Sequence, residues 1–406
     1  MAEWRRSTWG EEISLEYGKA LRDYSDAPGP VRVFGTNGPV GWTDEPLADG
    51  PGVILGRKGA YRGVQFSPDP FFVIDTAYYV VPKTELDMRW LYYAIIFHDL
   101  GKIDDGSPIP STTRAAVYPR ALDVPPPAEQ RAIAGVLGAL DDKIEQNRQT
   151  SRALECLARA IFRAWFVDFE PVKAKSAGAT GFPSMPQDTF DALPTRFVDS
   201  ELGPIPKGWE AKPIGDVVTV KGGATPSTKV AEYWGDGQHC WATPKDLSRL
   251  SDPVLLDTER RITDAGLAQI SSGLLPVGTV LLSSRAPIGY LAVAGVPTAI
   301  NQGFIAMVCN GPLPPVYVFN WTHHAMEQIK GRASGTTFPE ISKSGFRPIP
   351  VVVPSPAVIK TFRCLIEPLF DLITATVSET GRLQAMRDYL LPRLLSGQVR
   401  VEVRHG

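Results

Sequence analysis

The 406-residue sequence has no excess of positive charge, few cysteines and no long apolar run. Its 42 lysines and arginines face 44 aspartates and glutamates, a net charge of −2, which argues against an isolated, strongly basic nucleic-acid binder. The four cysteines have no close partner in the sequence, so we expect reduced structural thiols. Because neither a signal peptide nor a membrane span is visible, we expect a cytoplasmic protein with no membrane partner.

The sequence also lacks the motifs of the common catalytic classes. It has no GxxxxGK[ST] loop, no GxGxxG loop at a strand-helix junction and no Asn-Pro dipeptide of the kind that holds the target amine in amino-methyltransferases. Its histidines, such as His98 and the pair His323 and His324, lack metal-ligand spacing and are better explained as packed or solvated side chains. We therefore expect no catalytic residues, no metal and no cofactor on this chain.

What the sequence does contain is one internal repeat. A proline-rich turn leads into a long helical pattern twice, and Pro127 in the first copy corresponds to Pro356 in the second, an offset of 229 residues. The offset holds without a gap from about residues 109 and 338 to residues 162 and 391. The segments before the helices match more loosely, at offsets of 227 from Val53 to Val280 and 226 from Ile74 to Ile300. Such a duplication suits a protein that binds two similar targets at a fixed separation.

The repeat divides the chain into five segments. Residues 1–125 and 209–353 are mixed segments, with short β-branched and aromatic runs between turn-forming clusters. Residues 126–170 hold the first long helix, and residues 354–406 hold the second with a tail. Residues 171–208 are rich in proline without a sustained period and form a connecting arm. We predict an α+β fold in which two mixed α/β domains are joined by two long helices, with a pseudo-two-fold repeat.

Both long helices carry apolar residues at alternating spacings of three and four, the pattern of a coiled-coil seam. Each seam turns polar at the same place, Asn147 and Ser151 in the first copy and Thr376 and Thr380 in the second. An antiparallel pair would bring these layers together and fix the register. The alternative is that each seam packs only on its own domain, but a helix of ~40 residues, near 60 Å long, would overhang a domain of this size. We also expect Pro368 to kink or briefly break the second helix.

Basic and polar residues cluster on predicted turns of both mixed segments. Lysine and arginine suit phosphates and guanine edges, glutamine suits adenine, and serine and threonine supply short donors and acceptors. One basic loop residue is more often a solvated surface charge, so only the clustering in both copies favours DNA contact. The candidates in the first segment are Arg57, Lys58, Tyr61, Arg62, Gln65, Lys102, Ser111, Thr112, Thr113 and Arg114. Those in the second are Lys221, Thr225, Ser227, Lys229, Lys245, Arg285, Lys330, Arg332, Ser334, Thr336, Thr337 and Lys343.

Three stretches, in this order along the chain, resemble the specificity subunits of type I restriction-modification systems. The stretch PPPAEQRAIAGVLGALDDKIEQNRQTSRALECLARAIFRAWFVDFEPV from Pro125 resembles the family's central conserved region. DSELGPIPKGWE from Asp199 is similar to the lead-in to its second target-recognition domain, and ASGTTFPEISKSGFRPIPVVVPSP from Ala333 resembles that domain's exit. The first domain departs from the family, since PSTTRAAV from Pro110 replaces a fuller Gly-Thr-x-x-Pro/Arg pattern.

The resemblance implies a non-catalytic reader of double-stranded DNA. Each target-recognition domain would read one half of a bipartite, asymmetric site, and the helices would form an antiparallel coiled coil that sets the spacing. Two modification subunits would dock on the coil and bring S-adenosylmethionine and adenine methylation, and restriction subunits would add translocation and cleavage with ATP and Mg²⁺. The aromatic cluster Phe162, Trp165, Phe166 and Phe169 is expected to be exposed and to serve as a docking surface.

Three other functions stay open at this point. The chain could be a self-sufficient DNA methyltransferase, a repeated scaffold or ligand-binding protein without a DNA role, or a specificity subunit of a system that only methylates. The near-neutral charge is compatible with DNA reading if two weak half-site contacts are joined and partner subunits supply positive charge.

Overall fold

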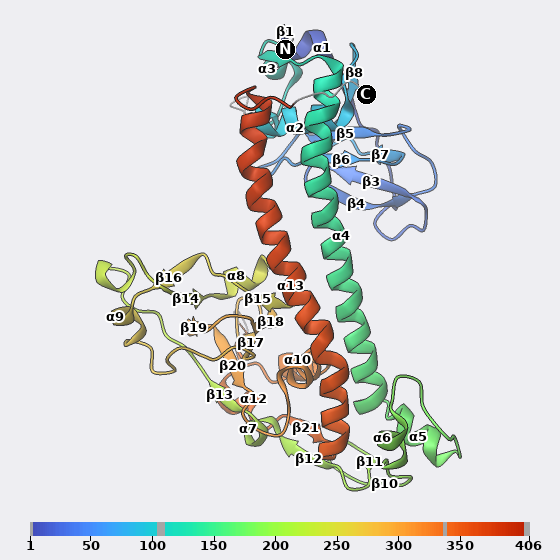
Figure 1. The fold of residues 1–406 in the computed structure, drawn as a ribbon, viewed down its shortest axis with the longest axis vertical. Coiled ribbons are helices and arrows are strands. Elements are labelled where there is room, and N and C mark those ends of the chain that lie inside the picture. Colours follow the sequence, from blue (N-terminus) through green and yellow to red (C-terminus); the bar gives the residue numbers. More distant parts are fainter. Residues whose placement is uncertain (1–2, 104–109, 336–338, 402–406) are drawn as a thin grey trace. The chain divides into compact units, whose positions relative to one another are not determined.

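The computed structural model describes residues 3–103, 110–335 and 339–401 (Figure 1). The chain forms two compact units, the first from Met1–Ile144 with Arg382–Gly406 and the second from Glu145–Gly381. Each unit contains one mixed α/β domain and one part of each long helix. The predicted α+β class with two mixed domains and two long helices is confirmed. The long helices are divided between the units because their apolar faces join the core of each domain in turn.

The first unit is built from three small sheets and short helices. Its main sheet has the strand order β2-β8-β5-β6 with antiparallel neighbours, and α2 packs against β5 and β6. The second sheet, β4-β3-β7, contains one parallel pair, and β1 pairs with β9. The strands are β1 Arg5–Thr8, β2 Ile13–Tyr17, β3 Val31–Gly35, β4 Gly38–Thr43, β5 Gly52–Gly56, β6 Val64–Ser67, β7 Phe71–Val73, β8 Ala77–Pro82 and β9 Ala121–Val124. The helices are α1 Trp9–Glu12, α2 Met88–Phe97, the short 3₁₀ helix η1 Leu100–Lys102 and α3 Arg114–Val117.

The second unit repeats this plan. Its main sheet has the strand order β13-β20-β17-β18-β15, and α10 packs against β17 and β18. A second sheet, β16-β14-β19, contains one parallel pair, and β12 pairs with β21. The strands are β10 Phe197–Val198, β11 Ile205–Pro206, β12 Glu210–Pro213, β13 Thr219–Lys221, β14 His239–Ala242, β15 Val254–Leu255, β16 Arg260–Ile262, β17 Val280–Ser283, β18 Leu291–Ala294, β19 Thr298–Ile300, β20 Phe304–Val308 and β21 Pro350–Val353. The short helices are α5 Glu170–Ser176, α6 Gln187–Asp191, α7 Ile214–Val217, η2 Ala231–Tyr233, α8 Pro244–Ser248, α9 Asp264–Leu267, α10 Pro315–His324, α11 Met326–Gly331 and α12 Lys343–Phe346.

Strand register aligns the two domains residue by residue. Gly56 pairs with Ala77 in the first unit and Ser283 with Phe304 in the second, an offset of 227 residues for both strands. The predicted offset of 226 for the later strand is therefore wrong by one residue, and Ile74 corresponds to Asn301. The alignment of Ile74 with Ile300 matched identical residues, but backbone pairing fixes the register of a strand. A shift of one residue would place every side chain of the strand on the opposite face of the sheet.

The helices α4 Pro127–Phe166 and α13 Pro356–Leu395 run antiparallel within each unit. In the first unit Arg387 donates to Asp141 at 2.8 Å. In the second, Asn147 Nδ2 donates to Glu379 Oε2 at 2.9 Å and to Thr380 Oγ1 at 3.3 Å. Residue numbers thus rise along one helix as they fall along the other, and the predicted meeting of the polar layers is confirmed. The same seams also join the domain cores, so the two packing schemes that the sequence left open coexist.

Two expectations about the connecting segments need correction. Helix α13 runs through Pro368 without the expected break, while the kink expected as its alternative stays a prediction. Pro368 and Cys364 face solvent, where water can bond the carbonyl that the proline leaves without a donor. The predicted arm also contains short elements, and its Phe190, Leu193 and Ile205 are buried in the core of the second unit. Proline-rich composition indicated a loose connection, whereas these apolar side chains attach the arm to the domain.

Candidate nucleic-acid interface

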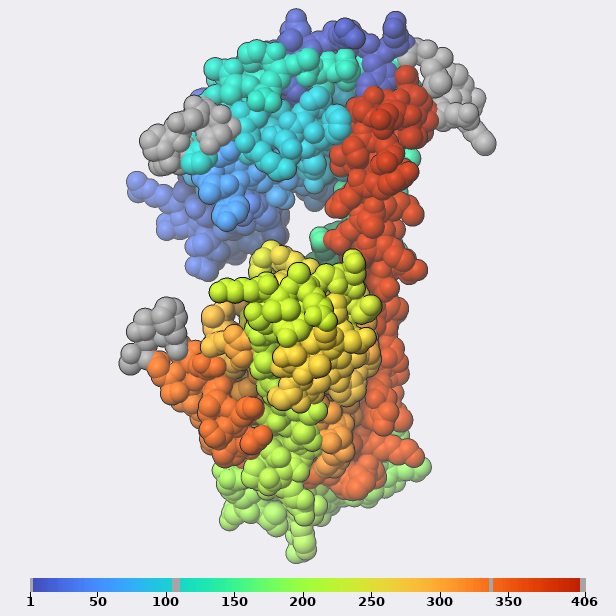
Figure 2. All heavy atoms as spheres, turned by 90° about the vertical axis from the view of Figure 1, so that its left-hand side faces the viewer, coloured from blue at the N-terminus to red at the C-terminus, as the bar shows by residue number. Residues whose placement is uncertain are grey.

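Several loops of the second unit meet at one edge of its main sheet. Strands β13 and β17 end at Lys221 and Ser283, and β20 begins at Phe304, opposite Ser283. The loop after α11 joins this edge, because the Ile341 N–H donates to the Ser284 carbonyl at 3.0 Å. Residues 332–335, which follow α11, lie at or near the surface of the unit, and this part of the chain is orange in the space-filling view (Figure 2). The antiparallel ladder therefore gathers loops that lie far apart in the sequence, from Lys221 to Ile341.

One group of candidates surrounds the end of β13. Lys221 Nζ donates to the Ser272 carbonyl at 3.2 Å, and Thr225 Oγ1 donates to Gln302 Oε1 at 2.6 Å. Lys343 lies over Gly222, with its Nζ 3.2 Å from where a Cβ on that glycine would stand. The next residue must also be glycine, because a Cβ there would stand 1.8 Å from the Ile300 carbonyl oxygen. Lys343 is thus brought next to the residue that follows Lys221, and Gln302 is a neighbour of Thr225 that sequence reasoning missed.

A second group surrounds the loop after β17. The Arg285 guanidinium and the Glu340 carboxylate form an ion pair at 3.6 Å, and their backbones form an isolated β-bridge. Glu340 also exchanges two backbone hydrogen bonds with Ser334, at 2.9 and 3.0 Å. Arg285, Glu340 and Lys330 line an open pocket of about 750 Å³ whose other walls include Ala286, Pro287 and Ile288. Glu340 was not among the predicted residues, since an acidic side chain carries no phosphate-binding signal.

The remaining candidates of this unit lie elsewhere on its surface or outside the described residues. Lys245 pairs with Glu259 at 3.0 Å, so its charge is offset on the protein itself. The Ser227 carbonyl accepts a hydrogen bond from Trp234 Nε1 at 3.0 Å, and Lys229 and Arg332 are exposed. Thr336 and Thr337 lie outside the described residues.

The corresponding edge of the first unit stacks arginines on tyrosines. The Arg57 guanidinium lies 5.0 Å from the ring centre of Tyr17 and donates to the Asp75 carbonyl at 2.8 Å. The Arg114 guanidinium lies 4.6 Å from the same ring, and its Nε donates to the Leu15 carbonyl at 2.7 Å. Tyr17 is 48% exposed, so this cationic and aromatic surface faces solvent. Sequence reasoning missed Tyr17, because nothing in its local pattern indicates two arginines from distant loops.

Tyr78 lies beneath this surface and stays protonated at neutral pH. Burial, followed by its interaction with Tyr17, raises the pKa of Tyr78 to about 12. Its ring is therefore neutral and lies 5.9 Å from the Arg57 guanidinium.

Two candidates of the first unit are structural rather than exposed. Arg62 donates to the carbonyls of Gly59, Gly101 and Ile103 at 2.6 to 3.0 Å and to Thr112 Oγ1 at 3.2 Å. Thr112 is fully buried, so it does not lie on the surface where the sequence suggested a DNA contact. The guanidinium of Arg62 is used to satisfy buried loop carbonyls, a demand that sequence alone does not reveal.

The other candidates of the first unit differ in their surroundings. Thr113 caps α3 by accepting from the Ala116 N–H at 3.3 Å, and Lys102 pairs with Asp99 at 2.8 Å. Lys58 is exposed, Tyr61 is 79% exposed, and Gln65 is half-buried on β6. Lys58 and Tyr61 thus remain available to an external ligand.

The aromatic cluster predicted as a docking surface is mostly buried. Phe162, Trp165 and Phe166 are at most 3% exposed, and the Phe166 ring centre lies 4.8 Å from Tyr317 and 4.9 Å from Phe362. The expectation of an exposed cluster is therefore wrong for these three residues. The apolar stripe of α4 is covered by α10 and α13 of its own unit, which the sequence of one helix cannot specify. The fourth residue, Phe169, is half-buried against Phe197 and Trp209.

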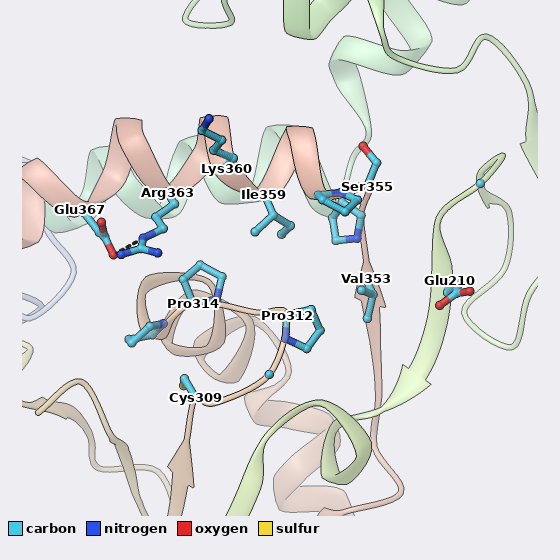
Figure 3. Close-up of a pocket in the computed structure, with 15 residues that line it drawn as sticks. Glu210, Cys309, Pro312, Pro314, Val353, Ser355, Ile359, Lys360, Arg363 and Glu367 are labelled. Carbon is cyan, nitrogen blue, oxygen red and sulfur yellow. Dashed lines mark hydrogen bonds and ion pairs between the residues drawn. The ribbon is translucent and has the colours of Figure 1, made fainter. Parts of the chain in front are cut away.

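A groove of about 780 Å³ lies at the start of α13 (Figure 3). Its walls are mainly apolar, with Pro312, Pro314, Val353 and Ile359, and Arg363 at one end pairs with Glu367 at 2.7 Å. Burial raises the pKa of the Cys309 thiol in this groove to about 12, so it is not a nucleophile at neutral pH.

Neither a metal cluster nor a membrane helix is found in the described parts of the chain. Within them, no three His, Cys, Asp or Glu side chains are placed together to hold a metal ion. No helix there combines the length and apolar character needed to cross a bilayer.

Known proteins resemble this chain over parts of its length. Residues 206–359 match the model of the type I restriction modification DNA specificity domain. The MjaIX specificity subunit of Methanocaldococcus jannaschii is 38% identical over 181 residues, which span 44% of this chain and 42% of that protein. The HindI specificity subunit of Haemophilus influenzae is 26% identical over 330 residues, 71% of each chain.

A solved structure shares the overall fold. The S subunit of the type I restriction-modification system from M. genitalium aligns over 96% of both chains with a TM-score of 0.63, at 16% sequence identity. Residues 206–359 thus match a specificity domain, and the chain is similar to specificity subunits of type I restriction enzymes over larger parts of its length.

Proposed function

We propose that this chain is the DNA sequence-specificity subunit of a type I restriction-modification complex, and that each unit reads one half of a bipartite, asymmetric site. The observation that carries the proposal is the pair of equivalent loop edges. Both follow the same strands of a duplicated sheet, yet one presents Arg57 and Arg114 on Tyr17 and the other presents Lys221, Thr225 and Lys343. One scaffold with different surface chemistry suits the reading of two different base sequences.

The helices α4 and α13 set the spacing between the two half-sites. Both are continuous over 40 residues and belong partly to each unit. The polar contact of Asn147 with Glu379 and Thr380 lies among apolar pairs, so it disfavours a shifted register. A fixed register would keep the gap in the recognised motif constant.

The partner subunits carry the chemistry in this proposal. Two modification subunits would bring S-adenosylmethionine and methylate adenine, and restriction subunits would supply ATP- and Mg²⁺-dependent translocation and cleavage in the cytoplasm. Since Phe162, Trp165 and Phe166 are buried, we place the docking surface on exposed apolar residues of the long helices instead. These residues are Val136, Met386 and Tyr389 in the first unit and Leu157 and Leu372 in the second.

Mapping methylated adenines tests the reading function. The full chain, produced with its modification subunit in a host without other adenine methylation, should methylate a bipartite motif with a fixed gap. A continuous palindrome, or methylation that does not depend on this chain, would contradict the proposal. Binding of S-adenosylmethionine to the isolated chain would instead favour a self-sufficient methyltransferase.

Substitution on the helices tests the docking surface. Leu372→Glu places a charge on an exposed apolar position and should weaken association with the modification subunit by about tenfold or more, measured by titration. Asp371→Lys, at the neighbouring exposed position, is the control for a change of charge alone. Equal effects of both variants would argue against an apolar contact at Leu372.

A further inference from the structure

The same loop-to-loop contact occurs in both units. An isolated β-bridge joins Lys58 to Ser111 in the first unit and Arg285 to Glu340 in the second. The neighbouring hydrogen bonds also correspond, because the N–H after each bridge donates to the carbonyl before it, at 2.9 Å in the first unit and 3.0 Å in the second. Lys58 is therefore equivalent to Arg285, and Ser111 to Glu340.

The helices that follow these bridges confirm the equivalence. Thr113 caps α3 through the Ala116 N–H at 3.3 Å, and Ser342 caps α12 through the Gly345 N–H at 3.1 Å. Each cap lies two residues after its bridge residue, at Ser111 or Glu340. The backbone thus holds the two bridge residues at equivalent positions in both units. Their side chains differ, Lys58 and Ser111 in the first unit and Arg285 and Glu340 in the second.

The pair in the second unit is held in place but only partly shielded from water. The Arg285 and Glu340 side chains are 39% and 44% exposed, and such a pair adds little to stability. Backbone bonds to Ser334 fix Glu340, while Ala286, Pro287 and Ile288 form the apolar pocket wall beside it. Stability alone is a weak explanation for an acidic residue at an edge that is otherwise basic.

We propose that these two loop positions determine base specificity, and that the pair in the second unit reads one G·C base pair. Arg285 would donate to guanine O6 and N7, and Glu340 would accept from the cytosine N4 amino group. This assignment rests on the proposed function as a DNA reader. It gives the acidic side chain a role that phosphate binding cannot give it.

Glu340 also rejects wrong bases in this arrangement. Its carboxylate carries only acceptor oxygens, so it is repelled by thymine O4 and by guanine O6 at the cytosine position. In the first unit the equivalent residue Ser111 is uncharged, so it does not repel acceptor atoms of a base as a carboxylate does, and this position discriminates less strongly. The two half-sites should therefore differ in how strictly this base pair is specified.

The test uses the full chain in complex with its modification subunit. Glu340→Gln keeps the size of the side chain and removes its charge, and duplexes that vary one base pair of the wild-type motif report binding and methylation. We expect the preference at one base pair of the second unit's half-site to fall by about tenfold to a hundredfold, with the other half-site unchanged. Glu327→Gln is the matched control, because Glu327 pairs with Lys330 at 3.6 Å in the same unit, and it should leave the motif intact.

Each outcome separates this inference from the proposed function. If Glu340→Gln leaves every base preference unchanged, or weakens all duplexes equally, the specificity role is wrong while the chain remains a DNA reader. If the relaxed base pair is not G·C, the assigned contact is wrong. If the wild-type complex shows no bipartite motif, the proposed function itself fails.

Discussion

The two units use one backbone plan for two different surfaces. In the first, arginines lie over Tyr17 at the edge of the main sheet, while in the second, Arg285 pairs with Glu340 and Lys343 lies over Gly222. Buried strand pairing has the same register in both, with one offset of 227 residues. The difference teaches that the ladder constrains the backbone, while side chains at the strand ends are free to vary because they do not fill the core.

The largest expected effect comes from substitutions in the hydrophobic cores of the two units. Phe362 and Ile133 occupy equivalent helix positions, are at most 1% exposed and belong to different units. Phe362→Ala should lower the free energy of unfolding of the second unit by about 3–5 kcal/mol, and Ile133→Ala that of the first by about 2–5 kcal/mol. Hydrogen exchange resolved by residue would check this, and loss of protection spread evenly over both units would contradict two separate cores.

Acid should also separate the two units. Buried Glu12 accepts bonds from Arg5 at 2.6 and 3.0 Å and from Thr84 at 2.5 Å, and the equivalent residue in the second unit is the buried Val217. Although burial alone would raise the pKa of Glu12, these hydrogen bonds lower it to about 2.

Because its folded pKa is depressed, Glu12 stabilises the first unit above the ordinary carboxyl pKa of 4.5, and that stability is lost as pH falls toward 2. We expect unit-selective unfolding in this range, measured by hydrogen exchange against pH. Glu12→Gln should reduce the stability at neutral pH and flatten the pH dependence. An identical pH profile for Glu12→Gln and the wild type would rule out this role.

Transfer of one residue from the second unit to the first tests whether Ser111 and Glu340 have equivalent roles. Ser111→Glu gives the first unit the acidic residue of the second and should change the base preference at one position of the first half-site by about tenfold. Methylation mapping of the complex should show the second half-site unchanged. A shift in both half-sites, or in neither, would contradict the equivalence of Ser111 and Glu340.

The smallest expected effect lies in the helix seam. Within the part of the chain that the structure describes, the buried Ser151 Oγ has no hydrogen-bond partner, whereas the neighbouring Asn147 is bonded. Ser151→Ala should therefore be neutral or raise the free energy of unfolding by about 1 kcal/mol, and Asn147→Ala should lower it by about 1–2 kcal/mol. Thermal denaturation of both variants decides this, and a marked loss for Ser151→Ala would reveal a role for the hydroxyl.

Patterns that depend on near neighbours were predicted well from the sequence. The heptad spacing predicted both long helices and the meeting of Asn147 with Thr380, because side-chain direction in a helix follows residue spacing. The internal repeat predicted two copies of one domain. The resemblance to the family rested on the same local stretches.

Patterns that depend on distant neighbours were not predictable in this way. Burial of Phe166 depends on Tyr317 and Phe362, and the role of Arg62 depends on carbonyl groups 39 and 41 residues away. The pairing of Arg285 with Glu340 required two loops to meet across a strand end.

The sequence by itself therefore determined the helices, the duplication and the resemblance to specificity subunits, since these follow from local periodicity and local motifs. Only the tertiary structure decided which polar side chains are exposed at the reading edges and which apolar ones are covered. The physical reason is that burial and hydrogen-bond satisfaction are properties of the packed chain, shared between segments that the sequence keeps apart.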